Sequence, residues 1–239
     1  MKIYANGCSF TYGDELISPA TTAWPALLAK KINATVNNDA ISGGTNYRTL
    51  YRTIKQQDNF DLYVIVWANN TRMTFYKSDN NFEVNFNPQL IHAMYGANPT
   101  FKKWGEVLYS QWYNELYSFK LWLQQIIQLQ SFFDVHNKNY LMVNTVANNI
   151  EKWTVAESRF IDSVKDLINF DIMSDEQILD EYREIQYYIQ LINKNKFYKW
   201  GEFCLTDITS TFPCGPNGHF LEEGHSHVAN LLYSHLCSK

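Results

Sequence analysis

The sequence predicts an α/β fold: a three-layer α/β/α sandwich with a flavodoxin-like parallel sheet of about five strands and a helical insertion. The clearest observation is the run at residues 61–67, DLYVIVW, which is typical of a central strand buried on both faces. Shorter apolar runs lie before and after it, and helical patterns separate them. Strands that alternate with helices imply a parallel sheet covered on both faces.

The first third of the chain supplies most of the sheet. The expected elements are a strand at 2–6, a helix at 23–32, a strand at 35–38, a helix at 46–57 and the central strand at 61–67. Pro25 suits the first turn of its helix, where a missing N–H costs little. Gly7 ends the opening strand and begins a tight turn.

The remainder is expected to be more helical. Residues 74–100 lose periodicity and collect Asn, Asp, Pro and Gly, so we expect an irregular excursion with a hairpin at 82–86. The later elements are a long helix at 104–133, a strand at 139–146, two or three helices within 150–195, a strand at 203–208 and a closing helix at 224–237. No repeat or linker interrupts the sequence, which predicts one domain over residues 1–239.

The composition argues against several classes of protein. A net charge of -4 argues against a nucleic-acid binder, and no apolar run reaches the length of a membrane span. The first residues lack a signal-peptide pattern, and the four cysteines form no Cys-x-x-Cys pair, so we expect a cytoplasmic protein with reduced thiols. The 7 Trp, 16 Tyr and 15 Phe suit either an aromatic core or a carbohydrate-binding cleft.

Two stretches at opposite ends carry the chemistry. Ser9 lies in the turn after the first strand, within Gly-Cys-Ser-Phe-Thr, and the neighbouring Cys8 is the alternative nucleophile. His219 precedes the last helix, within His-Phe-Leu-Glu-Glu-Gly-His. A serine followed much later by a histidine is an order found in several hydrolases.

With these stretches, Asn38-Asp-Ala-Ile-Ser-Gly and Trp67-Ala-Asn-Asn, the chain resembles the SGNH (GDSL-like) hydrolase family in four blocks over nearly its whole length. The resemblance implies a serine esterase that needs no cofactor, with Ser9 as nucleophile and His219 as base. It also implies an oxyanion hole made by the Ser9 N–H, the Gly43 N–H and the Asn69 side chain. Gly44 and Asn70 are alternatives shifted by one residue. Short hydrolases rich in Asn and Tyr look similar to phage-encoded proteins.

One departure concerns the acid that orients the histidine, which the family places three residues earlier, where this chain has Pro216. Three options follow: a Ser–His dyad with a carbonyl orienter such as Asn217, a relocated acid with Asp207 the nearest upstream carboxylate, or a weakened enzyme. The departure also motivates an alternative function, a non-catalytic binding or assembly protein on the same fold.

The expected partner is a small-molecule or carbohydrate ester, with no nucleic acid and no membrane, and the oligomeric state stays open. Arg72 is expected either in a surface ion pair or in contact with an anionic or sugar substrate. A metal site is the competing enzyme hypothesis, because His219, His225 and His227 are close in sequence. However, residues two apart on a helix face different directions, and no metal-binding motif accompanies them. The sequence therefore predicts no metal.

Overall fold

The computed structural model describes residues 1–56, 59–77, 82–86, 99–165 and 173–238. Four parallel strands form the main sheet in the order β2-β1-β3-β6. Their bounds are β1 Lys2–Asn6, β2 Thr35–Asn38, β3 Leu62–Trp67 and β6 Tyr140–Asn144. The order in which later strands are added on both sides of β1 is that of flavodoxin-like sheets, and the predicted α/β class is confirmed.

The central strand β3 is buried along its whole length, as its apolar run predicts. Its side chains alternate between two hydrophobic cores, because successive residues of a strand point to opposite faces. Leu62, Val64 and Val66 belong to one core, and the residues between them belong to the other. Both faces must therefore be covered by helices.

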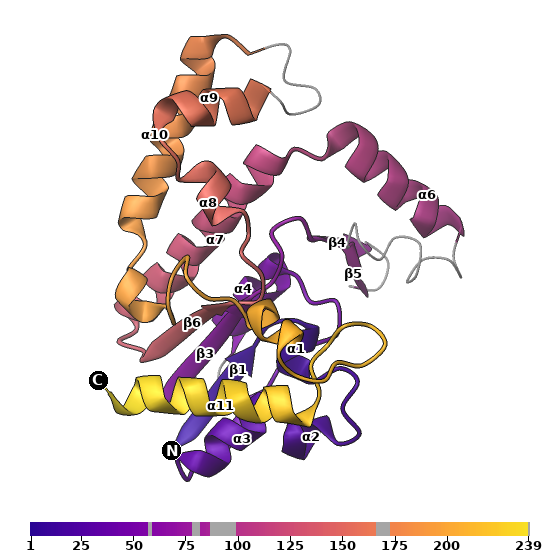
Figure 1. The fold of residues 1–239 in the computed structure, drawn as a ribbon, viewed down its shortest axis with the longest axis vertical. Coiled ribbons are helices and arrows are strands. Elements are labelled where there is room, and N and C mark those ends of the chain that lie inside the picture. Colours follow the sequence, from indigo (N-terminus) through magenta and orange to yellow (C-terminus); the bar gives the residue numbers. More distant parts are fainter. Residues whose placement is uncertain (57–58, 78–81, 87–98, 166–172, 239) are drawn as a thin grey trace.

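Helices α3 (Trp24–Lys31) and α11 (Glu222–Cys237) cover one face and lie side by side in Figure 1. Trp24 and Leu28 of α3 and Val228 and Leu232 of α11 are buried against this face. Helix α3, which lies early in the chain, and α11, the last helix, therefore share one layer (Figure 1).

Helices α4 (Asn46–Lys55) and α7 (Glu115–Val135) cover the other face. Helices α9 (Glu157–Lys165) and α10 (Asp175–Leu191) extend the core beyond α7, and the short α8 (Ile150–Trp153) precedes them. Figure 1 shows these helices rising away from the sheet, which is the predicted helical insertion.

The segment between β3 and α7 differs in part from the prediction. The expected hairpin exists, with β4 (Met73–Lys77) antiparallel to β5 (Phe82–Phe86). The long helix expected at 104–133 is divided into α6 (Pro99–Val107), a π-helix at Leu108–Trp112 and α7. The division falls at Asn114, whose side chain accepts a hydrogen bond from the Tyr117 N–H and so starts a new helix.

The last predicted strand, at 203–208, is wrong. The chain forms a 3₁₀-helix at Leu205–Ser210 instead. Short apolar runs do not distinguish strands from buried helical turns, and this one contains polar residues that bond to their own backbone. The fifth position of the sheet holds a single parallel bridge, between Phe197 and Met142.

Short helices complete the architecture: α1 (Ser9–Tyr12), α2 (Pro19–Thr22) and a 3₁₀-helix at Lys194–Lys196. Within the described ranges, no helix combines the length and the apolar character that crossing a membrane requires.

Candidate active site

The loops that carry the predicted site residues gather at one edge of the sheet. All four strands are parallel, so their carboxyl ends lie on the same side. In open α/β sheets this edge is where ligands bind. The loop that precedes α11 reaches the same region and lies beside α1 (Figure 1). Segments from both ends of the chain therefore meet here.

Ser9 begins the short helix α1, and two residues separate it from the end of β1. Gly7 makes this tight passage possible, because a Cβ there would lie 2.7 Å from Thr11 Oγ1 and 2.9 Å from the Val66 carbonyl oxygen. The Ser9 N–H opens the helix, a position whose N–H has no acceptor within the helix. The turn thus brings the Ser9 hydroxyl and the Ser9 N–H to the edge of the sheet, on a residue that is itself buried.

The thiol of Cys8 is directed into the interior. Cys8 is fully buried, and its Sγ lies 3.5 Å from Oγ1 of Thr145, just beyond β6. A buried thiol among uncharged groups is inert toward substrates. The Cys8 side chain is therefore packed in the interior against Thr145.

The loop after β2 packs directly on the segment that carries Ser9. A Cβ on Gly44 would lie 2.6 Å from the Gly7 carbonyl oxygen and 3.3 Å from the Cys8 Cα, so this close approach requires glycine. The Gly44 N–H donates to the Ile41 carbonyl at 3.1 Å. Gly43 has a φ of 68°, which glycine adopts readily, and its N–H has no acceptor among the described residues. Of the two glycines, Gly43 has the available donor.

Of the two asparagines after β3, Asn69 is the better placed to donate to a substrate. Its Oδ1 accepts a hydrogen bond from the Thr71 N–H at 2.9 Å, which fixes the side chain and leaves Nδ2 as its remaining donor. Asn70 is buried, and its Nδ2 is enclosed by protein without a partner. The backbone N–H of Asn70 donates to Asn148 Oδ1 at 2.9 Å. Of the two asparagines, Asn69 therefore keeps a side-chain donor that is not enclosed.

Arg72 joins the loops after β2 and β3. Its Nη1 donates to the Gly44 carbonyl at 3.1 Å. The described residues offer it no carboxylate, so the expected surface ion pair is replaced by this bond. Arg72 therefore braces the glycine loop that carries the candidate oxyanion donor.

Buried asparagines hold the remaining loop backbone. The side chain of Asn46 accepts from the Ala68 N–H at 2.7 Å and donates to the Ala68 carbonyl at 3.1 Å. Asn148 Nδ2 donates to the same carbonyl at 3.2 Å. Because a side-chain amide has both donors and an acceptor, it can hydrogen-bond to the N–H and C=O groups of loop backbone that no neighbouring strand reaches. This use explains part of the abundance of asparagine in the sequence.

His219 lies beside the nucleophile segment. Its ring centroid is 4.8 Å from that of Phe10, the residue that follows Ser9. No hydrogen bond joins Ser9 to His219 in the described part of the chain. The two predicted catalytic residues are thus brought into one neighbourhood without being bonded to each other.

The His219 ring also contacts a carboxylate, through Nδ1. His219 Nδ1 lies 3.0 Å from Glu15 Oε2, and the His219 backbone N–H donates to the same oxygen at 3.1 Å. The Asn217 backbone N–H donates to Glu15 Oε1 at 2.8 Å, and Asn217 Nδ2 lies 3.3 Å from that oxygen. Asn217, considered from the sequence as an acceptor for the ring, instead donates to the carboxylate.

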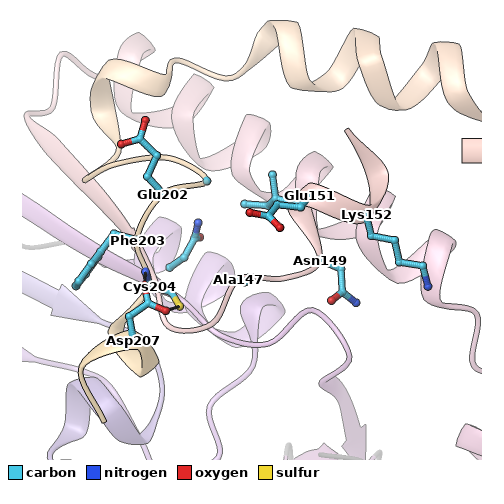
Figure 2. Close-up of a pocket in the computed structure, with 11 residues that line it drawn as sticks. Ala147, Asn149, Glu151, Lys152, Glu202, Phe203, Cys204 and Asp207 are labelled. Carbon is cyan, nitrogen blue, oxygen red and sulfur yellow. Dashed lines mark hydrogen bonds between the residues drawn. The ribbon is translucent and has the colours of Figure 1, made fainter. Parts of the chain in front are cut away.

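Asp207 does not orient His219. Its carboxylate accepts the Cys204 N–H at 2.7 Å and lies 3.0 Å from Cys204 Sγ, so it caps the turn in which it lies. Figure 2 shows Asp207 and Cys204 on one wall of a cavity of about 350 Å³, with Asn149 and Lys152 on the opposite wall. Ser9, Gly43, Asn69 and His219 do not line this cavity.

The remaining histidines of the cluster have structural contacts. His225 is buried, and its Nδ1 accepts the Trp24 N–H at 3.1 Å. Burial, with a smaller contribution from nearby His219, lowers the pKa of His225 to about 3, so the ring is neutral. The ring of His227 packs on Phe212. In the described ranges, no three His, Cys, Asp or Glu side chains are grouped so as to hold a metal ion.

Sequence reasoning did not find Glu15. It lies six residues after Ser9, and no local pattern connects it with a histidine near the other end of the chain. The available signal was indirect: a missing acid before His219, and a carboxylate in the loop that follows the nucleophile.

The fold is similar to that of several solved lipolytic proteins and esterases. The psychrotrophic esterase EstA from Pseudoalteromonas sp. is 11% identical, with 99% of this chain and 97% of that chain covered and a TM-score of 0.50. A second similar structure is that of a carbohydrate esterase whose active site is described as having "divergent catalytic and non-catalytic binding functions". It is 14% identical, with 100% of this chain and 65% of that chain covered and a TM-score of 0.51. At these identities the likeness establishes the fold.

Another similar structure is a protein described as lipolytic and of the G-D-S-L family, from Desulfitobacterium hafniense DCB-2. It is 11% identical, with 98% of each chain covered and a TM-score of 0.48. No curated protein matches the sequence.

A family model, DUF6071, described as a family of unknown function, matches residues 17–170. The chain belongs to this family. The matched region includes Gly43 and Asn69, whereas Ser9, Glu15 and His219 lie outside it.

Proposed function

We propose that this protein is a serine esterase of the SGNH type, formed by one domain, that cleaves an ester through an acyl-enzyme intermediate. The observation that carries the proposal is the contact of the His219 ring with Phe10, at a centroid distance of 4.8 Å. It brings His219, in the loop before α11, next to Phe10, the residue that follows Ser9. A nucleophile and its base need this proximity before they can share a proton.

In the first half of the reaction, Ser9 Oγ attacks the ester carbonyl carbon while His219 Nε2 takes the hydroxyl proton. The carbonyl oxygen becomes an oxyanion, which accepts hydrogen bonds from the Ser9 N–H, the Gly43 N–H and Asn69 Nδ2. The tetrahedral intermediate then breaks its bond to the alcohol oxygen. His219 returns the proton to this alcohol, and an acyl group remains on Ser9.

In the second half, a water molecule replaces the alcohol. His219 accepts one of its protons while the water oxygen attacks the acyl carbon. The same three donors stabilise the second oxyanion. Its collapse releases the carboxylic acid and restores the Ser9 hydroxyl with the proton held by His219. No cofactor takes part.

An O-acyl group on a carbohydrate is the substrate class that we favour. The similar structure with a TM-score of 0.51 is described as that of a carbohydrate esterase. Exposed aromatic residues, among them Tyr12 and Tyr47, follow the Ser9 and Gly43 segments closely in the chain. Aromatic rings suit the apolar faces of sugars.

A fluorophosphonate probe tests the proposal, because it reacts covalently with an activated serine. We expect stoichiometric labelling of the wild-type protein at Ser9, identified by peptide mass spectrometry, and no labelling of Ser9→Ala. Cys8→Ala is the matched control and should label as the wild type does, since the Cys8 thiol is buried. Labelling that disappears in Cys8→Ala but persists in Ser9→Ala would contradict the assignment of the nucleophile.

The alternative is a binding or assembly protein on the same fold. The lack of a Ser9–His219 hydrogen bond in the described chain favours it. A folded wild-type protein that stays unlabelled at high probe excess, and that hydrolyses neither p-nitrophenyl acetate nor acetylated sugars, would select this alternative over the esterase.

A further inference from the structure

The C-terminal loop lacks the acid that would orient its histidine. Pro216 stands three residues before His219, and a proline offers neither a charge nor an N–H. The ring nevertheless has a carboxylate partner on its Nδ1 side, which is Glu15 Oε2 at 3.0 Å. Glu15 comes from the opposite end of the chain, from the loop that follows α1.

We propose that Glu15 is the positioning residue for His219, so that the stretch Ser9–Glu15 supplies both the nucleophile and the orienting acid. This inference rests on the proposed esterase function. It settles the three options left by Pro216 in favour of a relocated acid. Glu15 acts through His219 and does not touch the substrate.

The carboxylate is held on both of its oxygens. Oε2 receives the backbone N–H of His219 as well as the ring, and Oε1 receives the backbone N–H of Asn217 at 2.8 Å. The Glu15 side chain is only 11% exposed. Backbone N–H groups, which can only donate, reach both oxygens. The site is therefore built for an acceptor on both sides, which a carboxylate provides and an amide does not.

The surrounding backbone makes room for this side chain. A Cβ on Gly215 would lie 2.5 Å from both Glu15 Cδ and Glu15 Oε1, so the loop passes the carboxylate only because residue 215 is glycine. Glu15 itself has a φ of 68°, a conformation that non-glycine residues rarely adopt and that costs free energy. Such strain persists only where the contacts of the residue compensate for it.

The hydrogen bonds also keep Glu15 ionised. Burial by itself raises the pKa of Glu15, but the backbone N–H groups of Asn217 and His219, followed by the His219 ring, outweigh it and lower the pKa. A carboxylate at Nδ1 keeps the proton of a neutral imidazole on Nδ1. Nε2 is then the free base, and the imidazolium formed during attack is stabilised.

Kinetics of the full chain test the inference. Glu15→Gln should lower kcat for p-nitrophenyl acetate by about 10²- to 10⁴-fold with little change in KM, as expected when a triad acid is replaced by an amide. Glu15→Asp, which keeps the charge on a shorter chain, should recover at least about tenfold of that loss. Glu223→Gln, an exposed glutamate of α11, is the matched control and should keep wild-type kcat.

Proton NMR of ¹⁵N-histidine-labelled protein gives a readout that does not depend on turnover. We expect the Nδ1–H signal of His219 in the wild type and in Glu223→Gln, and its loss in Glu15→Gln, where exchange with water is no longer blocked. If Glu15→Gln does not fold, the same comparison is made with Glu15→Asp, for which a weakened but present signal is expected.

The outcomes separate the two proposals. Wild-type kcat and an unchanged Nδ1–H signal in folded Glu15→Gln would overturn the role of Glu15 and leave the esterase intact. A wild-type protein that is inactive and unlabelled, but whose Nδ1–H signal still depends on Glu15, would overturn the esterase and leave the positioning of His219 by Glu15 intact. Glu15→Asp with full activity and no such signal would also count against Glu15.

Discussion

At the scale of single residues, the candidate site uses asparagine for two different tasks. The side-chain amides of Asn46 and Asn148 form hydrogen bonds with the backbone of the loop after β3, so these two residues are structural. In Asn69 only the side-chain oxygen is engaged, since it accepts the Thr71 N–H, and Nδ2 remains as a donor. Residue type alone does not separate these tasks, because an asparagine suits both.

This division leads to a prediction for the neighbouring pair. Asn69→Ala should lower kcat by about 10²- to 10³-fold, since one oxyanion donor is lost, with the melting temperature nearly unchanged. Asn70→Ala should keep kcat, because Asn70 Nδ2 is enclosed by protein and the hydrogen bond from Asn70 to Asn148 is made by the backbone N–H. Steady-state kinetics and thermal unfolding of both variants check this. The reverse pattern would assign the oxyanion donor to Asn70.

At the scale of elements, the loop before α11 depends on its fit around Glu15. Gly215→Ala introduces a Cβ that would lie 2.5 Å from the carboxylate, and the side chain is easier to displace than the backbone. We therefore expect kcat to fall by at least about tenfold, while the free energy of unfolding falls by only about 1 kcal/mol, the worth of a hydrogen bond. Kinetics and urea unfolding measure the two effects.

The double variant Gly215→Ala, Glu15→Gln decides whether the glycine acts through Glu15. If it does, the double variant should be no slower than Glu15→Gln alone, because the same interaction has already been lost. Additive losses in kcat would mean that Gly215 influences catalysis by another route.

The elements also show what the sequence could predict. β1 and β2 have the predicted bounds, and β3 and α11 lie within a few residues of theirs, because each has a strong period or run. The strand at 203–208 was wrong because Asp207 accepts the Cys204 N–H and closes a 3₁₀-turn, a local hydrogen bond that hydrophobicity does not encode. The hydrophobic pattern of the helix predicted at 104–133 runs on through Asn114, but the Asn114 side chain caps α7 there and divides the helix.

For the candidate site, the limit is distance along the chain. Ser9, Gly43, Asn69 and His219 each lie in a local motif and could be proposed without coordinates. Glu15 could not, since its role depends on the fold bringing it to a loop more than half the chain away. Loss of the acid at Pro216 was readable from the sequence, but its replacement was not.

At the scale of the whole molecule, two of the side chains that link the ends of the chain by hydrogen bonds are Glu15 and His225. Glu15 binds the loop before α11, and His225 within α11 accepts the backbone N–H of Trp24, which begins α3. The first contact lies at the candidate site and the second in the hydrophobic layer that α3 and α11 share. Folding of the C-terminal helix onto α3 therefore brings His219 to the Ser9 segment.

The His225 contact predicts a specific dependence of stability on pH. The pKa of the buried ring is lowered from 6.5 to about 3, chiefly by burial, so below pH 6.5 the unfolded chain binds a proton there that the folded protein does not. Stability conferred by the neutral ring is therefore complete above about pH 6.5 and is lost progressively as the pH falls toward 3. Between pH 7 and 5 most carboxylates remain ionised, so this histidine should dominate the change.

His225→Gln tests this, because a glutamine oxygen can accept the Trp24 N–H but does not titrate. The wild type should lose about 2 kcal/mol more unfolding free energy than the variant between pH 7 and pH 5, from a proton bound by the unfolded chain alone. Urea unfolding at the two pH values measures the difference, and probe labelling of Ser9 should be retained at pH 7. Equal losses in both proteins would mean that the ring is protonated in the folded state, and the junction of α3 and α11 would then need another explanation.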